Sequence, residues 1–325
     1  MRALWLEDQK LSFRPQVPKP VVRQGEALIQ VLLAGVCSTD LELLRGYYTF
    51  TGIPGHEFVG RVVSSPGDPT WTGMRVVGEI NIACGECETC KSGLPRHCER
   101  RKALGIHAWN GSFAEYLVLP IINLHPIPEH VPDEMAVFTE PLAAAGEVLE
   151  QVSIKQGDRV LVIGAGRLGQ LVAMVIRETG CSLQVLARHP NQRELLTRHN
   201  IEVISEDDLA TRKYDLIVEA TGSADGFALA CEAIRPRGTI VLKSTYKGKA
   251  PVDFSPIVVD EISLIGSRCG PFTLALRLLA DGKVDPRPLI EATYPLEQGI
   301  AALEQAARPG VLKVLLKPGD ASHRD

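Results

Sequence analysis

The chain has 325 residues, of which 45% are hydrophobic, 23% are charged and 5% are aromatic. This length exceeds what one hydrophobic core usually covers, so we expect two folded domains, and the composition excludes wholesale disorder. The net charge of −4 supplies no basic field for nucleic acid. The apolar runs are far shorter than the ~20 residues that a bilayer span needs, and Glu7 and Asp8 interrupt any apolar export signal. We therefore expect a cytoplasmic protein that binds neither nucleic acid nor membrane.

The first part of the chain is rich in β-branched and aromatic runs separated by glycine and proline. These runs predict strands at 27–33, 58–63, 75–80 and 113–119. Such a succession of short strands predicts a compact, barrel-like β domain.

From about residue 140 onward, helical and strand patterns alternate. Helices are predicted at 142–151, 170–179, 227–234 and 273–281. Strands are predicted at 159–163, 182–187, 215–219, 239–243 and 263–266, with a last strand near 311–317. Strands that alternate with helices predict an α/β domain with a doubly wound parallel sheet.

Four of the eight cysteines, Cys84, Cys87, Cys90 and Cys98, are clustered in the pattern CxxCxxC followed by a fourth cysteine after seven residues. Two disulfides or an iron–sulfur cluster are alternatives. Four thiolates converging in a short loop suit a closed tetrahedral zinc site, which an intracellular chain without other signs of electron transfer favours. We therefore predict a structural zinc that stabilises a lobe at about 84–98.

A second group of potential metal ligands comes from three separate stretches. Cys37 precedes a predicted short helix whose N-terminus favours a thiolate, His56 and Glu57 follow a Pro-Gly turn, and Glu140 precedes a proline. Taken singly, each residue has a structural explanation in packing or helix capping. Together with a zinc lobe they predict a catalytic zinc that has three protein ligands and an open position.

The segment after residue 159 has the order strand, GxGxxG turn and helix. Gly164 permits the tight turn, Gly166 lets the backbone approach a pyrophosphate, and Gly169 lets the helix pack closely on the strand. Arg167 and Leu168 complete the turn at the start of the helix. The order of elements predicts a dinucleotide-binding site.

The end of the next strand indicates which dinucleotide is bound. Where NAD sites place an acidic residue about 20 residues beyond the glycines, this chain has Ala187, followed by Arg188. Arg188, together with Arg193, would attract a 2′-phosphate, so we predict NADP(H) in preference to NAD(H). The alternative is that Arg188 faces solvent and selectivity is slack.

The motifs Cys37 with Thr39 and Asp40, Gly55-His56-Glu57, the four-cysteine lobe, Glu140-Pro141-Leu142-Ala143 and the later GxGxxG occur in one order along the chain. This order resembles the zinc-containing medium-chain dehydrogenase/reductase superfamily of alcohol and polyol dehydrogenases. The resemblance implies a GroES-like β-barrel catalytic domain from 1–141 and 271–325, and a Rossmann domain from 142–270.

The resemblance also implies roles for single residues. Cys37 and His56 would bind the catalytic zinc, Glu57 or Glu140 would be the third ligand, and Thr39 would hydrogen-bond the substrate oxygen. Asp40 would orient His56. A glutamate at position 140 is similar to the polyol and sugar branch rather than to alcohol dehydrogenases with a cysteine there.

The expected activity is hydride transfer between a small alcohol or carbonyl substrate and a nicotinamide cofactor, with two zinc ions per chain in a homodimer or homotetramer. Four aromatic and imidazole side chains are candidates for substrate contact: Tyr47, Phe50, His107 and Trp109. Two other functions stay open, namely a zinc-free quinone or enone reductase and a non-catalytic NADPH-binding sensor.

Overall fold

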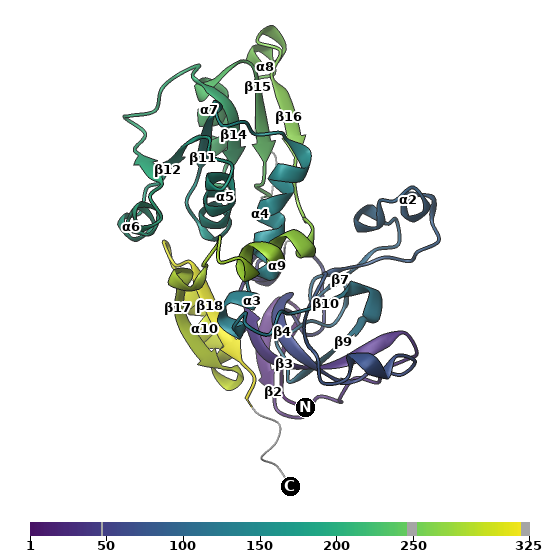
Figure 1. Ribbon diagram of the computed structural model, residues 1–325. Helices are drawn as coiled ribbons and strands as arrows, with labels where there is room; N and C mark the ends of the chain where they lie inside the picture. The colour runs from purple at the N-terminus through teal and green to yellow at the C-terminus, as the bar shows by residue number, and fades with distance from the viewer. Residues whose placement is uncertain (47, 246–251, 320–325) are drawn as a thin grey trace. The chain divides into compact units, whose positions relative to one another are not determined.

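The computed structural model describes residues 1–46, 48–245 and 252–319 (Figure 1). The chain divides into two compact units: Met1–Glu140 together with the chain from Ala275 onward, and Pro141–Leu274. No helix in the described ranges has the length and apolar character needed to cross a bilayer.

The first unit is built mainly of short antiparallel strands. Its largest sheet has the order β10-β5-β4-β3-β18-β17, and β9 also pairs with β3. The bounds of these strands are β3 Glu26–Gly35, β4 Glu57–Ser64, β5 Arg75–Gly78, β9 Tyr116–Pro120, β10 Leu124–Pro126, β17 Ile290–Pro295 and β18 Lys313–Lys317. Strands β3, β4, β5 and β9 fall on the four runs predicted in this part, and β18 falls on the predicted last strand.

Two smaller sheets complete the strands of this unit. Strands β1 (Ala3–Glu7) and β2 (Lys10–Arg14) form a hairpin, and a second sheet has the order β6-β7-β8. The bounds of that second sheet are β6 Asn81–Ile82, β7 Lys102–Leu104 and β8 Ala108–Trp109. The helices are α1 Ser38–Leu44, α2 Glu88–Lys91, α3 Asp133–Ala136 and α10 Gly299–Ala306.

The second unit contains a six-stranded, all-parallel sheet in the order β13-β12-β11-β14-β15-β16. The strands are β11 Arg159–Ile163, β12 Ser182–Leu186, β13 Glu202–Ile204, β14 Tyr214–Glu219, β15 Ile234–Leu242 and β16 Ser263–Gly266. Because the strand order runs outward in both directions from β11 and β14, this is the predicted doubly wound sheet.

The helices of this unit are α5 Arg167–Arg177, α6 Pro190–Arg198, α7 Ala224–Ala233 and α8 Ser255–Val259. The boundaries of the two units fall within helices α4 (Thr139–Gln151) and α9 (Phe272–Ala280). Strand β11 is buried on both faces from Val160 to Ile163, as a central parallel strand between helical layers should be.

The register of three strands in the first unit brings distant parts of the sequence together. Gly35 at the end of β3 pairs with Glu57 at the start of β4, and also with Leu315 on β18. The amide of Val36 then donates to the carbonyl of Val314 over 2.9 Å. The ends of β3, β4 and β18 therefore meet at one point, next to Cys37, His56 and Glu57.

Candidate functional site

Cys37 lies at the N-terminus of helix α1, in the extended conformation of an N-cap residue. Its amide donates to Oδ2 of Asp40 over 2.8 Å, which satisfies one of the free amides at the start of the helix. The thiol therefore lies at the positive end of the helix, where a thiolate is stabilised. Oγ1 of Thr39 is 3.9 Å from Sγ of Cys37, so the hydroxyl lies beside the sulfur.

The turn before β4 presents His56 and Glu57. Gly55 has φ +95°, and a Cβ at this position would lie 2.4 Å from the ring of Phe113, so both the conformation and the space require glycine. His56 and Glu57 are both buried. One ligand atom from each of Cys37, His56 and Glu57 lies within 4.8 Å of the others.

Asp40 holds both the cysteine and the histidine. While Oδ2 accepts from the amide of Cys37, Oδ1 lies 3.2 Å from Nδ1 of His56. Burial lowers the pKa of His56, but the charges of Asp40 and Cys37 outweigh this effect and hold it well above the ordinary value. The surroundings of the imidazole therefore favour a positive charge, which a proton or a metal cation can supply.

Lys313 approaches the same site from β18. Its Nζ donates to Oε2 of Glu57 over 2.5 Å, and both side chains are at most 3% exposed. A Cβ at Gly35 would lie 2.2 Å from that Oε2, so only glycine leaves space for the ion pair. The other oxygen of Glu57, Oε1, is buried without a hydrogen-bond partner among the described residues. Sequence reasoning missed Lys313, although a buried lysine within the apolar run of β18 is itself a signal.

These residues fit a divalent cation. Asp40, Glu57 and a Cys37 thiolate carry three negative charges against one positive charge on Lys313, so an M²⁺ ion neutralises the group. A thiolate, an imidazole and a carboxylate are ligands that zinc accepts, and Oε1 of Glu57, which has no hydrogen-bond partner in the described part of the chain, is a carboxylate oxygen of this kind. Glu140, half-buried in the first turn of α4, is not in the gathered set of Cys37, His56 and Glu57.

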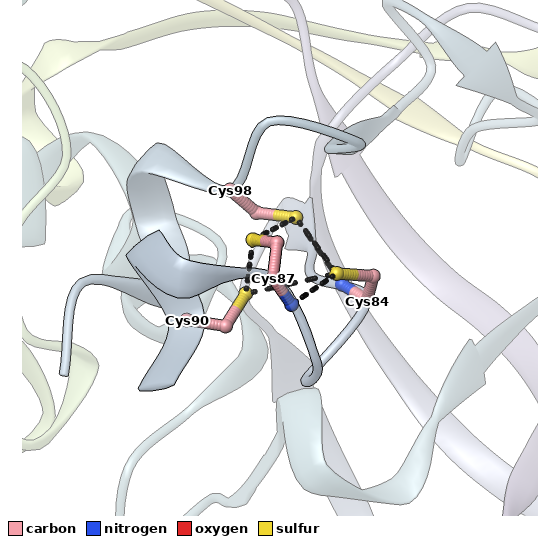
Figure 2. A group of neighbouring side chains, drawn as sticks. All are labelled: Cys84, Cys87, Cys90 and Cys98. Atoms are coloured by element: carbon pink, nitrogen blue, oxygen red, sulfur yellow. Dashed lines mark hydrogen bonds between the residues drawn. The ribbon is translucent and has the colours of Figure 1, made fainter. Parts of the chain in front are cut away.

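The four clustered cysteines converge on one point (Figure 2). Their sulfur atoms are separated by 3.5 Å for Cys84 and Cys98, 3.4 Å for Cys87 and Cys90, 3.8 Å for Cys87 and Cys98, and 3.9 Å for Cys84 and Cys90. A tetrahedron with metal–sulfur bonds of ~2.3 Å has edges of ~3.8 Å, so the spacing fits one zinc ion. The cysteines are free thiols and the sulfurs lie too close to enclose a cluster of several irons.

Hydrogen bonds lower the pKa of Cys84 and Cys87, whereas burial and the neighbouring thiols raise the pKa of Cys90 to about 12. The amides of Glu86 and Cys87 lower the pKa of Cys84 to about 6, and the guanidinium of Arg100 donates to the same Sγ over 3.3 Å. Four thiolates this close repel one another unless a cation lies between them. The cluster therefore provides a ligand set for a metal with no open position.

The glycine-rich turn of the second unit has the geometry that phosphate binding requires. Gly164 has φ +98°, and a Cβ on Gly169 would lie 1.9 Å from the carbonyl oxygen of Gly164. At Gly166, the N-cap of α5, a Cβ would meet nothing within 4 Å, so the space in front of the helix is open. The first amides of any α-helix have no acceptor within that helix, so the N-terminus of α5 carries the positive end of a helix dipole toward this turn.

The three residues predicted to determine dinucleotide specificity differ in their exposure and in their hydrogen-bond partners. Ala187 is buried at the end of β12, and the Arg188 side chain beyond it is 64% exposed and paired with Glu206. Arg193 instead donates from Nη1 to the carbonyls of Ala187 and Ile204, at 2.9 and 3.2 Å. Arg193 thus ties the ends of β12 and β13 together, while Arg188 presents its charge to solvent.

Three of the four candidates for substrate contact lie in the first unit, and the fourth, Tyr47, is outside the described residues. Phe50 is half-buried, and His107 is exposed. The indole of Trp109 donates to the carbonyl of Val118 over 2.8 Å, so its polar end is held by the backbone.

Comparison with known proteins gives the chain a family context. Residues 23–129 match the alcohol dehydrogenase GroES-like domain. A D-arabinitol dehydrogenase from Uromyces fabae is 30% identical, covering 98% of this chain and 97% of the relative. A zinc-binding dehydrogenase from Sinorhizobium meliloti 1021, solved with NADP, has a TM-score of 0.91 at 26% identity and covers 98% of this chain and 99% of that one. An alcohol dehydrogenase from Escherichia coli CFT073, solved with NADH, has a TM-score of 0.89 at 27% identity with the same coverage.

Proposed function

Because this chain belongs to the zinc-type medium-chain dehydrogenase superfamily, we propose that it is a zinc-dependent oxidoreductase acting on an alcohol or polyol, or on the corresponding carbonyl. Its hydride partner in this proposal is NADP(H). The observation that carries the proposal is that ligand atoms of Cys37, His56 and Glu57 lie within 4.8 Å of one another, and that one buried oxygen of Glu57 has no hydrogen-bond partner in the ranges that the structure describes. The name of the D-arabinitol dehydrogenase relative supports a polyol as substrate.

Each side chain of the site has a distinct task in this proposal. When bound, zinc supplies a Lewis acid toward the substrate oxygen and lowers the pKa of an alcohol. Cys37 and His56 hold the ion, and Asp40 fixes the ring of His56 through the contact between Nδ1 and Oδ1. The hydroxyl of Thr39 lies beside Sγ of Cys37, and its oxygen accepts a hydrogen bond from the hydroxyl of the substrate alcohol.

Two glutamates are candidates for the third zinc ligand in this proposal. Lys313 binds only Oε2 of Glu57, which leaves Oε1 to act as third ligand. Glu140 is the alternative, and its place in the first turn of α4 leaves it outside the gathered set. We favour Glu57 as the ligand of the resting site, with Lys313 holding its carboxylate in place.

For the second cofactor we propose NADP(H) bound at the turn that contains Gly164, Gly166 and Gly169, with the pyrophosphate at the N-terminus of α5. The buried Ala187 offers no carboxylate to ribose hydroxyls, and the exposed Arg188 offers a charge to a 2′-phosphate. The nicotinamide ring accepts or donates the hydride.

We further assign catalysis to a domain of 1–141 and 271–325 and dinucleotide binding to a domain of 142–270. Cys84, Cys87, Cys90 and Cys98 would bind the second, structural zinc, since their sulfurs fit a tetrahedron. The eight cysteines all lie in the described ranges and form no disulfides, which suits a reducing compartment and supports a cytoplasmic location.

The proposed assembly is a homodimer or homotetramer. Strand β16 lies at the end of the parallel sheet and pairs with β15 on one side. Apolar side chains are exposed on and beside it, with Leu264 at 37%, Phe254 at 61%, Val258 at 74% and Val259 at 78%. An apolar sheet edge of this kind is a pairing surface for a second copy, and the solution mass tests it.

Metal quantification combined with a substrate screen tests the proposed activity. We expect two zinc ions per chain and NADP-dependent oxidation of at least one polyol or alcohol. Cys37→Ala and His56→Ala should each lose one zinc and nearly all turnover. One zinc or none, with turnover of quinones or enones, would instead identify a zinc-free reductase. Bound NADPH without turnover of any alcohol or aldehyde would identify a sensor.

A further inference from the structure

The ends of β12 and β13 are joined so that one residue from each side forms an ion pair. Leu186 pairs with Ile204 in the parallel register, and the amide of Ala187 donates to the carbonyl of Ile204 over 3.4 Å. Arg193 donates to the carbonyls of both Ala187 and Ile204. The residues that follow these two strand ends are therefore held side by side.

The segment after β13 forms a hydrogen-bonded turn that presents Glu206. The hydroxyl of Ser205 donates to Oδ2 of Asp208 over 2.5 Å, and the amide of Asp208 donates to the carbonyl of Ser205 over 3.3 Å. The amide of Leu209 donates to the carbonyl of Glu206 over 3.1 Å. The backbone that carries Glu206 is thus fixed by its own turn.

From this turn the carboxylate of Glu206 binds the guanidinium of Arg188. Nε of Arg188 donates to Oε1 of Glu206 over 2.6 Å, and Nη2 lies 2.5 Å from the same oxygen. The side chains are 64% and 45% exposed, so a ligand that arrives from solvent can reach both. Arg188 is the residue to which the proposed function assigns the 2′-phosphate.

We propose that Glu206 is a specificity-determining residue that competes with the 2′-phosphate of NADP(H) for Arg188. The inference rests on the proposed function, because it requires that Arg188 binds the 2′-phosphate. With NAD(H) bound, the pair between Arg188 and Glu206 persists. With NADP(H) bound, the 2′-phosphate must replace the Glu206 carboxylate as the partner of Arg188. The negative charge of Glu206 also repels the phosphate. Glu206 therefore weakens the binding of NADP(H) relative to that of NAD(H), and the chain is able to use both dinucleotides.

Dissociation constants of NADPH and NADH for the full-length protein test this role without any substrate. Glu206→Gln keeps the shape of the side chain and removes its charge. We expect it to tighten NADPH binding by about two- to fivefold at low ionic strength, as for loss of one exposed opposing charge, and to leave NADH binding nearly unchanged. The gain should shrink in ~0.5 M salt, where charges are screened.

Asp207→Asn is the matched control, because it removes the same charge from the next residue, which is also exposed. It should change both constants by less than about twofold. In an Arg188→Ala background, Glu206→Gln should tighten NADPH binding by less than it does in the original protein, since only the direct repulsion between the carboxylate and the phosphate is then removed.

An unchanged ratio of the NADPH and NADH constants in Glu206→Gln would overturn the inference. Weaker NADH binding in this variant would also overturn it, since Glu206 would then be a ribose ligand. If Arg188→Ala leaves NADPH binding unchanged, the assignment of Arg188 fails, and the role of Glu206 fails with it. If Arg188→Ala weakens NADPH binding but Glu206→Gln has no effect, only the role of Glu206 fails.

Discussion

Replacing Lys313 by methionine removes the only cation that an ion pair of the described residues brings to Glu57. Lys313 and Glu57 are 3% and 1% exposed and their charged atoms are 2.5 Å apart, so the pair is shielded from water. Removal of one partner from such a pair leaves a buried charge and costs about 3–5 kcal/mol. For a unit of this size the midpoint of thermal unfolding should fall by roughly 6–20 °C.

Thermal unfolding of matched variants measures this cost. Lys317→Met is the control, because Lys317 lies on the same strand and is exposed. It should move the midpoint by less than about 2 °C, as for a surface substitution. The double variant Glu57→Gln with Lys313→Met should recover part of the loss, since no unpaired charge remains.

A Lys313→Met midpoint equal to that of Lys317→Met would refute the reasoning, because the pair would then contribute no more than a surface contact. A double variant that is less stable than Lys313→Met by the full cost of Glu57→Gln would show that the two side chains act independently.

Two further substitutions test other contacts of the structure. Gly35→Ala places a Cβ 2.2 Å from Oε2 of Glu57 and should displace the carboxylate, so turnover should fall at least about tenfold in a protein that still folds, measured by steady-state kinetics. Asp215→Asn tests a carboxylate of the parallel sheet: partial burial raises the pKa of Asp215, but the amide of Arg159 and the guanidinium of Arg235 hold it below its ordinary value. The Asp215 carboxylate should therefore contribute about 1 kcal/mol to the free energy of unfolding above about pH 4, and this contribution should disappear as the pH falls further. Urea unfolding of the original chain and of Asp215→Asn at several pH values measures it. A difference between the two that does not depend on pH would contradict this.

Local patterns predicted those parts of the molecule whose structure is set by neighbouring residues. The glycine turn around Gly164 and the cysteine lobe each lie within a short stretch of chain, and the alternation of strands and helices predicted a doubly wound parallel sheet. Helix α4 begins at Thr139 rather than at residue 142, because a proline is tolerated in the first helical turn and need not precede it. Short strands such as β13 and β17 carry too few residues for a periodic signal.

The contacts that escaped prediction join residues far apart in sequence. Lys313 and Glu57 are separated by 256 positions, and only the pairing of β18 with β3 and of β3 with β4 places them together. Similarly, Arg188 meets Glu206 because β12 and β13 are adjacent and Arg193 joins their ends. A sequence shows that these charges exist but not which of them are paired.

An anomalous difference map at the zinc absorption edge, from crystals of the full-length protein, tests the central proposal most directly. The proposed function requires two peaks per chain. One should lie among the four cysteine sulfurs, and the other about 2.3 Å from Sγ of Cys37 and about 2.1 Å from a ring nitrogen of His56. A single peak at the cysteine lobe, with Cys37 and His56 bound to no metal, would contradict it.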